Sequence, residues 1–174
     1  MFRASLGIVA LLAVSLAAAR SPAITRANLL GIGDLAPPFA VDTLDGRSID
    51  GNFHGRPAYI NVFATWCSPC RREFPAILRQ AEQYRDRIDF LLVDDQEPAS
   101  RVKSFANQLG AAAPIAVDRG QFAASFDVQG LPESIFIDRR GIVRYIYQGT
   151  IPDGVLAGEL SALASDSQRS LAAR

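Results

Sequence analysis

A short apolar run that leads straight into two closely spaced cysteines constrains this chain more than any other feature. Residues 58–64 are largely apolar and predict a buried strand, and Cys67-Ser68-Pro69-Cys70 follows directly, ahead of a helical pattern. The chain has 2 cysteines, and both are in this segment. Positions three apart on a helical turn lie about 5–6 Å from each other, which suits a disulfide. A strand that delivers a Cys-x-x-Cys pair to the first turn of a helix predicts a redox-active site.

The places of the two cysteines on the helix predict different roles for them. Cys67 falls at the helix N-terminus, where peptide dipoles and unpaired N–H groups favour a thiolate over the neutral thiol. The helix carries an apolar stripe that faces a core, formed by Phe74, Ile77, Leu78 and Ala81. Cys70 lies on that face, one turn earlier. We expect Cys67 to lie at the exposed tip and attack a partner's disulfide, and Cys70 to be sheltered and resolve the mixed disulfide.

Two simpler interpretations of the cysteine pair fit less well. A zinc site takes about four ligands, and the two cysteines with the distant His54 do not supply them. His54 reads as a solvated loop residue rather than a catalytic base. A purely structural disulfide would close a loop too short to stabilise the fold much, because the gain grows with loop length. The sequence therefore predicts redox chemistry by the cysteines alone, with no metal and no cofactor.

Residues 1–23 differ from the rest of the chain and predict an export signal. A short basic start precedes an almost wholly apolar, alanine-rich run at 4–19, and small residues that suit cleavage follow. The run is slightly shorter than the roughly 20 residues of a membrane-spanning helix, so a cleaved signal and an uncleaved inner-membrane anchor both stay open. Either places the predicted domain, residues 24–165, in the periplasmic or extracytoplasmic space. Residues 166–174 read as a flexible C-terminal tail.

The order of the remaining segments predicts an α/β fold. Strands are predicted at 39–42, 48–49, 58–64, 88–93, 114–117, 134–138 and 142–148, and helices after Cys70, from Pro98, at 121–126 and from Pro152. This order predicts a mixed central sheet flanked by helices on both faces, with a variable insertion at 94–118. The 18 basic and 18 acidic side chains balance, so no basic field predicts binding to nucleic acid.

Several stretches of the sequence resemble the TlpA/ResA-type extracytoplasmic thioredoxins. Residues 66–75, Trp-Cys-Ser-Pro-Cys-Arg-Arg-Glu-Phe-Pro, resemble the active site of that family, and residues 126–138 resemble its Gly-x-Pro segment. The Pro-Glu pair at 132–133, followed by Arg-Tyr-x-Tyr-Gln-Gly at 144–149, is similar to the DsbE/CcmG branch, the thioredoxins of cytochrome c maturation. The resemblance covers residues 33–160 and implies a thioredoxin-like fold.

The resemblance also implies which residues contact a substrate. It implies that Pro132 is a cis proline beside the disulfide, which leaves the backbone of Leu131 free to pair with a substrate segment as an added strand. Trp66 is expected to act as a flat cover over the disulfide. Glu133 matches an acid of the DsbE/CcmG branch, and its role stays open between tuning the thiols, contacting a partner and facing water.

Glu73 lies three residues after Cys70 and shares roughly one helix face with it. In ResA-like proteins the matching acid lies near the thiols and assists proton transfer. The resemblance thus implies that Glu73 serves as acid or base for Cys70, with a raised pKa if the carboxyl group is partly buried. The alternative is a solvated glutamate in the first turn of the helix, favoured by the helix dipole. The sequence does not decide between the two.

These observations lead to one principal hypothesis. The chain is expected to be a thiol–disulfide oxidoreductase that reduces exported proteins with cysteine pairs, apocytochrome c among them, and is recharged by a membrane thiol–disulfide electron carrier. The uncharged Ser68-Pro69 pair between the cysteines favours a reductant over an oxidant. The alternatives are a general reductase or oxidant of exported proteins and a non-catalytic dithiol binding module. A peroxidase would need Thr-x-x-Cys, whereas Thr65 lies only two residues before Cys67.

Overall fold

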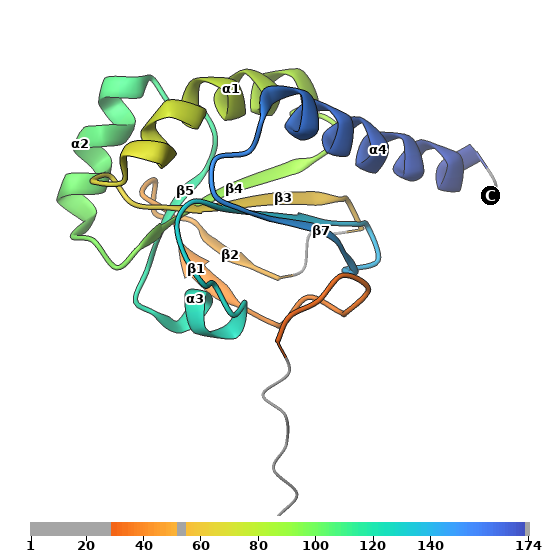
Figure 1. Cartoon of the computed structure of the whole chain (residues 1–174), viewed down its shortest axis with the longest axis horizontal. Coiled ribbons are helices and arrows are strands. Elements are labelled where there is room, and N and C mark those ends of the chain that lie inside the picture. The colour runs from red at the N-terminus through yellow and green to blue at the C-terminus, as the bar shows by residue number, and fades with distance from the viewer. Residues whose placement is uncertain (1–28, 52–54, 173–174) are drawn as a thin grey trace, which may run out of the picture.

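The computed structural model of the protein describes residues 29–51 and 55–172, and the side chains up to residue 165 (Figure 1). The strands are β1 (Ala40–Asp42), β2 (Ser48–Asp50), β3 (Ala58–Phe63), β4 (Asp89–Asp95), β5 (Ile115–Asp118), β6 (Glu133–Ile137) and β7 (Val143–Gln148). The helices are α1 (Ser68–Tyr84), α2 (Ala99–Leu109), α3 (Gln121–Ser125) and α4 (Asp153–Ala172). No helix in this part of the chain is both long and apolar enough to cross a lipid bilayer. The expected signal or anchor at 1–23 and His54 lie outside the described residues.

The central element is a five-stranded sheet in the order β5-β4-β3-β6-β7, and β1 pairs with β2 in a small sheet of its own. β3 lies in the middle, parallel to β4 and antiparallel to β6, so the sheet is mixed as the sequence predicts. All of β3 is buried. A strand covered on both faces reads as a near-continuous apolar run, which explains the composition of residues 58–64.

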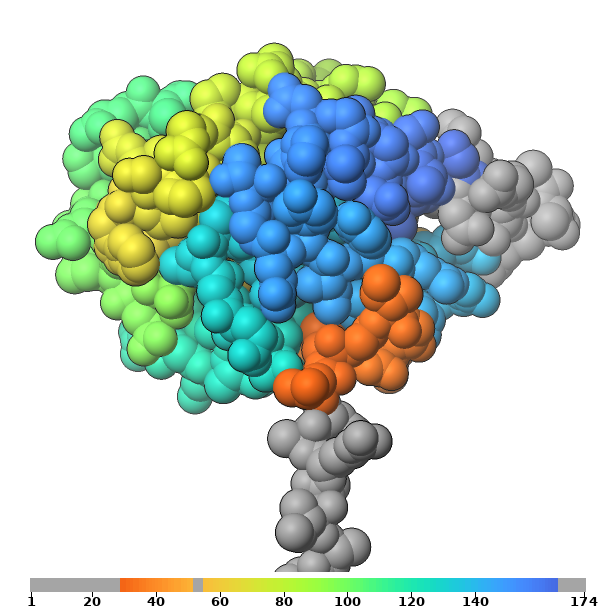
Figure 2. Space-filling view, viewed as in Figure 1, coloured from red at the N-terminus to blue at the C-terminus, as the bar shows by residue number. Residues whose placement is uncertain are grey.

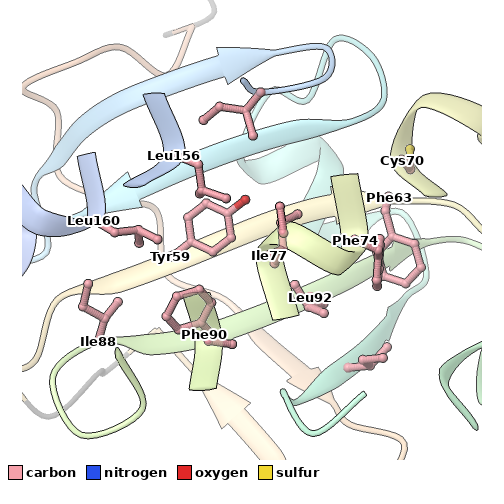
Figure 3. Packing of buried hydrophobic residues seen from close by; sticks show 14 of the residues in the cluster. Tyr59, Phe63, Cys70, Phe74, Ile77, Ile88, Phe90, Leu92, Leu156 and Leu160 are labelled. Atoms are coloured by element: carbon pink, nitrogen blue, oxygen red, sulfur yellow. The ribbon is translucent and has the colours of Figure 1, made fainter. Parts of the chain in front are cut away.

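Helices cover the two faces of the sheet unequally (Figure 1). α1, α2 and α4 lie on one face, where Phe74 packs against Phe63 of β3 and Leu160 lies beside Tyr59 in one large cluster (Figure 3). On the other face, the short α3 and the β1–β2 hairpin cover the sheet with Phe122 and Val41. The predicted fold class, a thioredoxin-like mixed sheet with helices on both faces, is confirmed.

α1 begins directly after the turn that follows β3. Cys67 is its N-cap residue, and Pro69 occupies one of its first two positions, where a missing N–H group costs little. The helix assignment continues through Pro75 to the end of the element. Its buried side includes Cys70 and Phe74, which confirms the predicted apolar face.

Most element boundaries differ from those predicted by about one residue, and three differences have a physical cause. Asp94 and Asp95 belong to β4, because their backbones continue the pairing with β5. Pro98 is the extended N-cap residue of α2 rather than its first helical residue. α4 continues to Ala172, so the backbone of residues 166–172 is helical where the sequence predicts a tail outside the domain. No glycine or proline interrupts that segment, so nothing in it ends the helix earlier.

Candidate active site

Two loops meet at one edge of the sheet and bring the predicted site residues together. β3 leads into the turn that carries Cys67, whereas β6 runs in the opposite direction and begins at Glu133, directly after Pro132. Because Val62 pairs with Glu133, the start of α1 and the loop before β6 lie side by side, as the yellow and cyan segments of Figure 2 show. The peptide bond between Leu131 and Pro132 is cis, as the resemblance implies.

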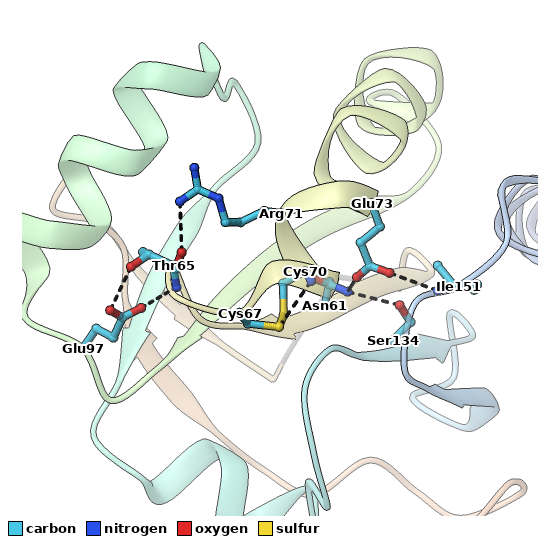
Figure 4. The surroundings of a disulfide bond; sticks show 9 residues. All are labelled: Asn61, Thr65, Cys67, Cys70, Arg71, Glu73, Glu97, Ser134 and Ile151. Atoms are coloured by element: carbon cyan, nitrogen blue, oxygen red, sulfur yellow. Dashed lines mark hydrogen bonds between the residues drawn. A yellow bond between two sulfur atoms is a disulfide. The ribbon is translucent and has the colours of Figure 1, made fainter.

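Cys67 and Cys70 form a disulfide across the first turn of α1, with their Cα atoms 5.3 Å apart (Figure 4). The backbone N–H of Cys70 donates a hydrogen bond to Cys67 Sγ at 3.2 Å. This is the contact that a thiolate at a helix N-terminus would use, so the predicted chemical setting of Cys67 is present.

The expected exposure of Cys67 is wrong, although the ranking of the two cysteines holds. Cys67 is only 4% exposed and Cys70 is fully buried. In the oxidised state the covalent bond to the buried Cys70 holds Cys67 Sγ over the helix N-terminus instead of in solvent. A substrate disulfide must therefore approach a nearly covered sulfur atom.

Trp66, directly before Cys67, has an exposed side chain. It is 66% exposed, as are few other large apolar side chains of the described chain. An exposed aromatic side chain beside a reactive sulfur is suited to contact a partner protein. Its predicted role as a cover over the disulfide stays a prediction.

Glu73 is buried at 3% exposure, so the solvated alternative for this residue is wrong. Its Oε1 accepts a hydrogen bond from Asn61 Nδ2 at 2.9 Å, and its Oε2 accepts one from the backbone N–H of Ile151 at 3.0 Å (Figure 4). Burial raises the pKa of Glu73, and these two donors oppose the rise. A carboxyl group with a raised pKa one turn after Cys70 is suited to act as an acid or base beside the thiols.

A buried polar network that was not predicted from the sequence extends from Glu73 into the sheet. Asn61 Nδ2 also donates to Ser134 Oγ at 3.2 Å, and Ser134 Oγ lies 2.9 Å from the hydroxyl oxygen of Tyr59. All three of these residues are fully buried. The signal was present in the sequence, because Asn61 is the one strongly polar residue of an otherwise apolar run.

Glu133 is also buried, at 1% exposure, so the interpretation that it faces water is wrong. Its Oε2 is 3.5 Å from the backbone nitrogen of Gln129, and it pairs across the sheet with Gln148. Burial raises the pKa of Glu133, which the N–H of Gln129 and the side chain of Gln148 oppose. Two buried acids, Glu73 and Glu133, thus belong to segments that meet at the disulfide.

Two further acids, Glu97 and Asp94, were not predicted from the sequence either, and Glu97 lies on the other side of the disulfide from Glu73 (Figure 4). Glu97 accepts hydrogen bonds from the backbone N–H and the hydroxyl of Thr65, the latter at 2.8 Å. The N–H of Glu97 donates to Asp94 Oδ1 at 2.9 Å. β3 and β4 are parallel, so residues that follow their carboxyl ends meet at one edge of the sheet. That topology could have indicated the contact.

Burial disfavours the charged form of both acids, but the net shift in pKa is upward for Asp94 and downward for Glu97. Burial raises the pKa of Asp94 to about 7, against the N–H bond from Glu97 and with help from the neighbouring Glu97 carboxylate. Burial also opposes ionisation of Glu97, but hydrogen bonds from Thr65, Asp94 and Arg101 hold its pKa below the ordinary range. Among the residues that the structure describes, no group of three or more His, Cys, Asp or Glu side chains is arranged to hold a metal ion.

Comparison with known proteins places these features in a family. The family model described as Redoxin matches residues 32–164. The chain belongs to the Redoxin family. Within it, the chain is a thiol–disulfide oxidoreductase of the ResA and DsbE type, with Cys67 and Cys70 as its redox pair.

Curated relatives and solved structures agree with this placement. The thiol-disulfide oxidoreductase ResA of Bacillus thuringiensis (strain Al Hakam) is 35% identical over 115 residues, 64% of this chain and 66% of that protein. The chain thus spans about two thirds of the length of this relative. ResA of Geobacillus thermodenitrificans (strain NG80-2) is 32% identical over 130 residues, 73% of this chain and 75% of that protein. A structure described as thiol:disulfide interchange protein DsbE from Chlorobium tepidum has a TM-score of 0.71 and 28% identity, and covers 78% of this chain and 99% of its own.

Proposed function

We propose that this protein works outside the cytoplasm as a reductant of disulfides in exported proteins, with apocytochrome c among its substrates. The observation that supports the chemistry best is the hydrogen bond from the N–H of Cys70 to Cys67 Sγ at the N-cap of α1. It favours a thiolate at Cys67, while the complete burial of Cys70 keeps that sulfur for an internal step. The similarity to proteins named ResA and DsbE supports the substrate class.

The proposed reaction runs in two exchange steps. The Cys67 thiolate attacks one sulfur of the substrate disulfide, and the other substrate sulfur leaves as a thiolate that takes up a proton. Cys70 then loses its proton and attacks Cys67 Sγ, so the mixed disulfide breaks and the second substrate sulfur leaves as a thiol. Two electrons pass to the substrate, and the Cys67–Cys70 disulfide seen in the structure forms. A membrane dithiol carrier restores the reduced pair by the same two steps in reverse.

The residues around the cysteines have proposed roles in these steps. Glu73, buried and with a raised pKa, accepts the proton of Cys70 in the second step. The backbone of Leu131, beside Pro132, pairs with the substrate segment that carries the disulfide. Trp66 offers an exposed apolar surface to the substrate. Glu133 adds a second buried acid directly after Pro132, where it tunes the thiols or meets the partner.

Turnover with a model substrate tests the activity. In insulin reduction with dithiothreitol as the electron source, the wild-type protein should accelerate precipitation of the reduced chains, and Cys67→Ser should not. Equal rates for the two proteins would favour the alternative of a non-catalytic binding module. Equilibration of the Cys67–Cys70 pair with glutathione buffers tests whether the protein is a reductant or an oxidant. The pair of a reductant has a low reduction potential, so most of it should stay oxidised in these buffers. The pair of a strong oxidant would be reduced.

Trapping in the native compartment tests the substrate class. Cys70→Ser leaves the first step intact and removes the second, so covalent adducts with true substrates should accumulate on Cys67. Adducts confined to cytochrome apoproteins would support the narrow proposal, and adducts with many exported proteins would favour the general reductase instead.

The proposed location depends on residues 1–23. Fractionation with N-terminal sequencing should find the protein outside the cytoplasm. A mature N-terminus near residue 24 would identify a cleaved signal, and an intact chain in the membrane fraction would identify an anchor. Recovery of the full chain in the cytoplasm would contradict the location.

A further inference from the structure

Thr65, two residues before Cys67, is held by charged side chains at each of its polar groups. Its N–H and hydroxyl both donate to the carboxylate of Glu97, and its carbonyl oxygen accepts from Arg71 Nη1 at 3.1 Å (Figure 4). Thr65 is 7% exposed and Glu97 is 8% exposed, so water competes little for these hydrogen bonds. Buried hydrogen bonds to a charged group are among the stronger ones in proteins.

The turn that Thr65 opens determines where the sulfur of Cys67 lies. The N–H of Cys67 donates to the carbonyl of Ala64 at 3.1 Å, and the carbonyl of Cys67 accepts the N–H of Arg71 at 3.1 Å. Cys67 Sγ then lies 3.2 Å from the N–H of Cys70. These bonds are local to the turn and the helix start. The bonds from Thr65 to Glu97, in contrast, tie this turn to the segment between β4 and α2.

Glu97 is itself fixed on that segment. Its backbone N–H is bound by the fully buried Asp94, and Arg101 Nη1 lies 3.4 Å from its Oε1. Arg71, which binds the far side of Thr65, has its guanidinium 5.2 Å from the centre of the Phe105 ring of α2. The turn is thus attached on both sides to α2 and the loop before it.

We propose that Glu97 is a positioning residue for the attacking thiol: through Thr65 it holds the turn so that Cys67 Sγ meets the N–H of Cys70. The proposal rests on the proposed function only in taking Cys67 as the attacking group. Loosening the turn lengthens the hydrogen bond to the sulfur, which weakens the preference for the thiolate. The effect should therefore appear in the pH at which Cys67 becomes reactive.

The test is the rate of Cys67 alkylation by iodoacetamide as a function of pH. It uses the reduced full chain with Cys70→Ser, so that Cys67 is the only thiol. Thr65→Val removes the hydroxyl donor without changing any charge. It should move the midpoint of the profile to higher pH and slow alkylation about threefold near neutral pH, through loss of support for the charged form. Thr65→Ser keeps the hydroxyl and should retain the original profile.

Thr43→Val is the matched control. Thr43 is also a buried threonine whose hydroxyl is hydrogen-bonded, but it lies in the turn between β1 and β2. It should leave the profile unchanged even if it lowers stability. A profile that moves equally in both valine variants, or in neither, would overturn the proposal.

Glu97→Gln supplies a second test if Thr65→Val does not fold. The substitution removes a negative charge, and by charge alone it should make the thiolate easier to form and move the profile to lower pH. If Glu97 acts by positioning, loss of one acceptor for Thr65 should move the profile to higher pH. A move to lower pH would overturn the proposal. Insulin reduction by the wild-type chain is measured separately, so failure here and failure of the proposed function are distinguishable.

Discussion

The carboxylate of Glu73 in α1 accepts a hydrogen bond from the backbone N–H of Ile151, 78 residues further along the chain, at 3.0 Å. The bond joins the helix that carries Cys70 to the segment that leads into α4. With Asn61 bound to the other carboxylate oxygen, Glu73 satisfies two buried donors from two different elements. Glu73, for which the family resemblance implies a role in proton transfer, thus also connects α1 with β3 and with the loop before α4.

Removal of this acid should lower the free energy of unfolding. Glu73→Ala leaves the donors of Asn61 and Ile151 buried without their acceptor, so we expect a loss of about 1–3 kcal/mol in urea unfolding. Glu82→Ala is the matched control on the same helix, since Glu82 is exposed and its ion pair is with the exposed Arg85. It should change stability by about 0.5 kcal/mol or less. Equal losses in the two variants would contradict a structural role for Glu73.

The pH dependence of the second exchange step should depend on Glu73. Because burial raises the pKa of Glu73, the carboxylate that accepts the proton of Cys70 is lost at a higher pH than for an ordinary glutamate. The wild-type rate of mixed-disulfide resolution should therefore fall as the pH is lowered through that raised value. Glu73→Gln should abolish this limb and slow resolution roughly 10²-fold at neutral pH. Stopped-flow measurement of thiol release as a function of pH gives the profile. An unchanged profile would remove Glu73 from proton transfer.

Stability should depend on pH through Asp94. Burial raises its pKa to about 7, above the ordinary value of 3.8, so the folded protein favours the neutral carboxyl group. That stabilisation is complete below the ordinary value and is lost as the pH rises through the folded value. Asp94→Asn stays neutral and keeps an oxygen for the N–H of Glu97. Urea unfolding should find the variant gaining on the wild type as the pH rises toward 7, and a constant difference would contradict the assignment.

Trp66→Ala should separate contact with a protein substrate from thiol chemistry. The side chain is 66% exposed, so we expect a change in unfolding free energy of about 0.5 kcal/mol or less. Insulin reduction should slow by roughly three- to tenfold, because an exposed aromatic anchor is lost from the encounter. Reduction of a small disulfide reagent should keep its rate. A parallel loss with both substrates would show that Trp66 acts on the thiols and not on the partner.

The sequence predicted the parts of the structure that periodicity and spacing control. The apolar run before Cys67 and the apolar stripe after Cys70 identified the central strand and its helix. A strand buried on both faces is apolar throughout, whereas a helix buried on one face has apolar residues only every three or four positions. The place of Cys67 at the helix N-terminus followed from the same reasoning and is confirmed. Its burial was not predictable in this way, since it depends on the bond to Cys70 and on the packing around it.

Contacts between distant segments were beyond the sequence argument. The partner of Glu73 at Ile151 depends on where the loop before α4 passes, which no local pattern encodes. Glu97 lies in a segment that the sequence analysis treated as a variable insertion, yet it binds Thr65 beside the cysteines. Two clues were present: Asn61, because a polar residue in the middle of a buried strand needs a partner, and the parallel order of β3 and β4, which brings Thr65 and Glu97 to one end of the sheet.

The most direct measurement of the central claim is the site of the mixed disulfide in purified protein. Reduced Cys70→Ser and reduced Cys67→Ser are each mixed with a peptide that contains one disulfide, and the adducts are mapped by mass spectrometry after proteolysis under acid conditions. We predict a stable adduct on Cys67 in the Cys70→Ser protein and little or none in the Cys67→Ser protein, because the remaining Cys70 is buried. Adducts that form as fast on Cys70 as on Cys67 would contradict the division of roles on which the proposed reaction depends.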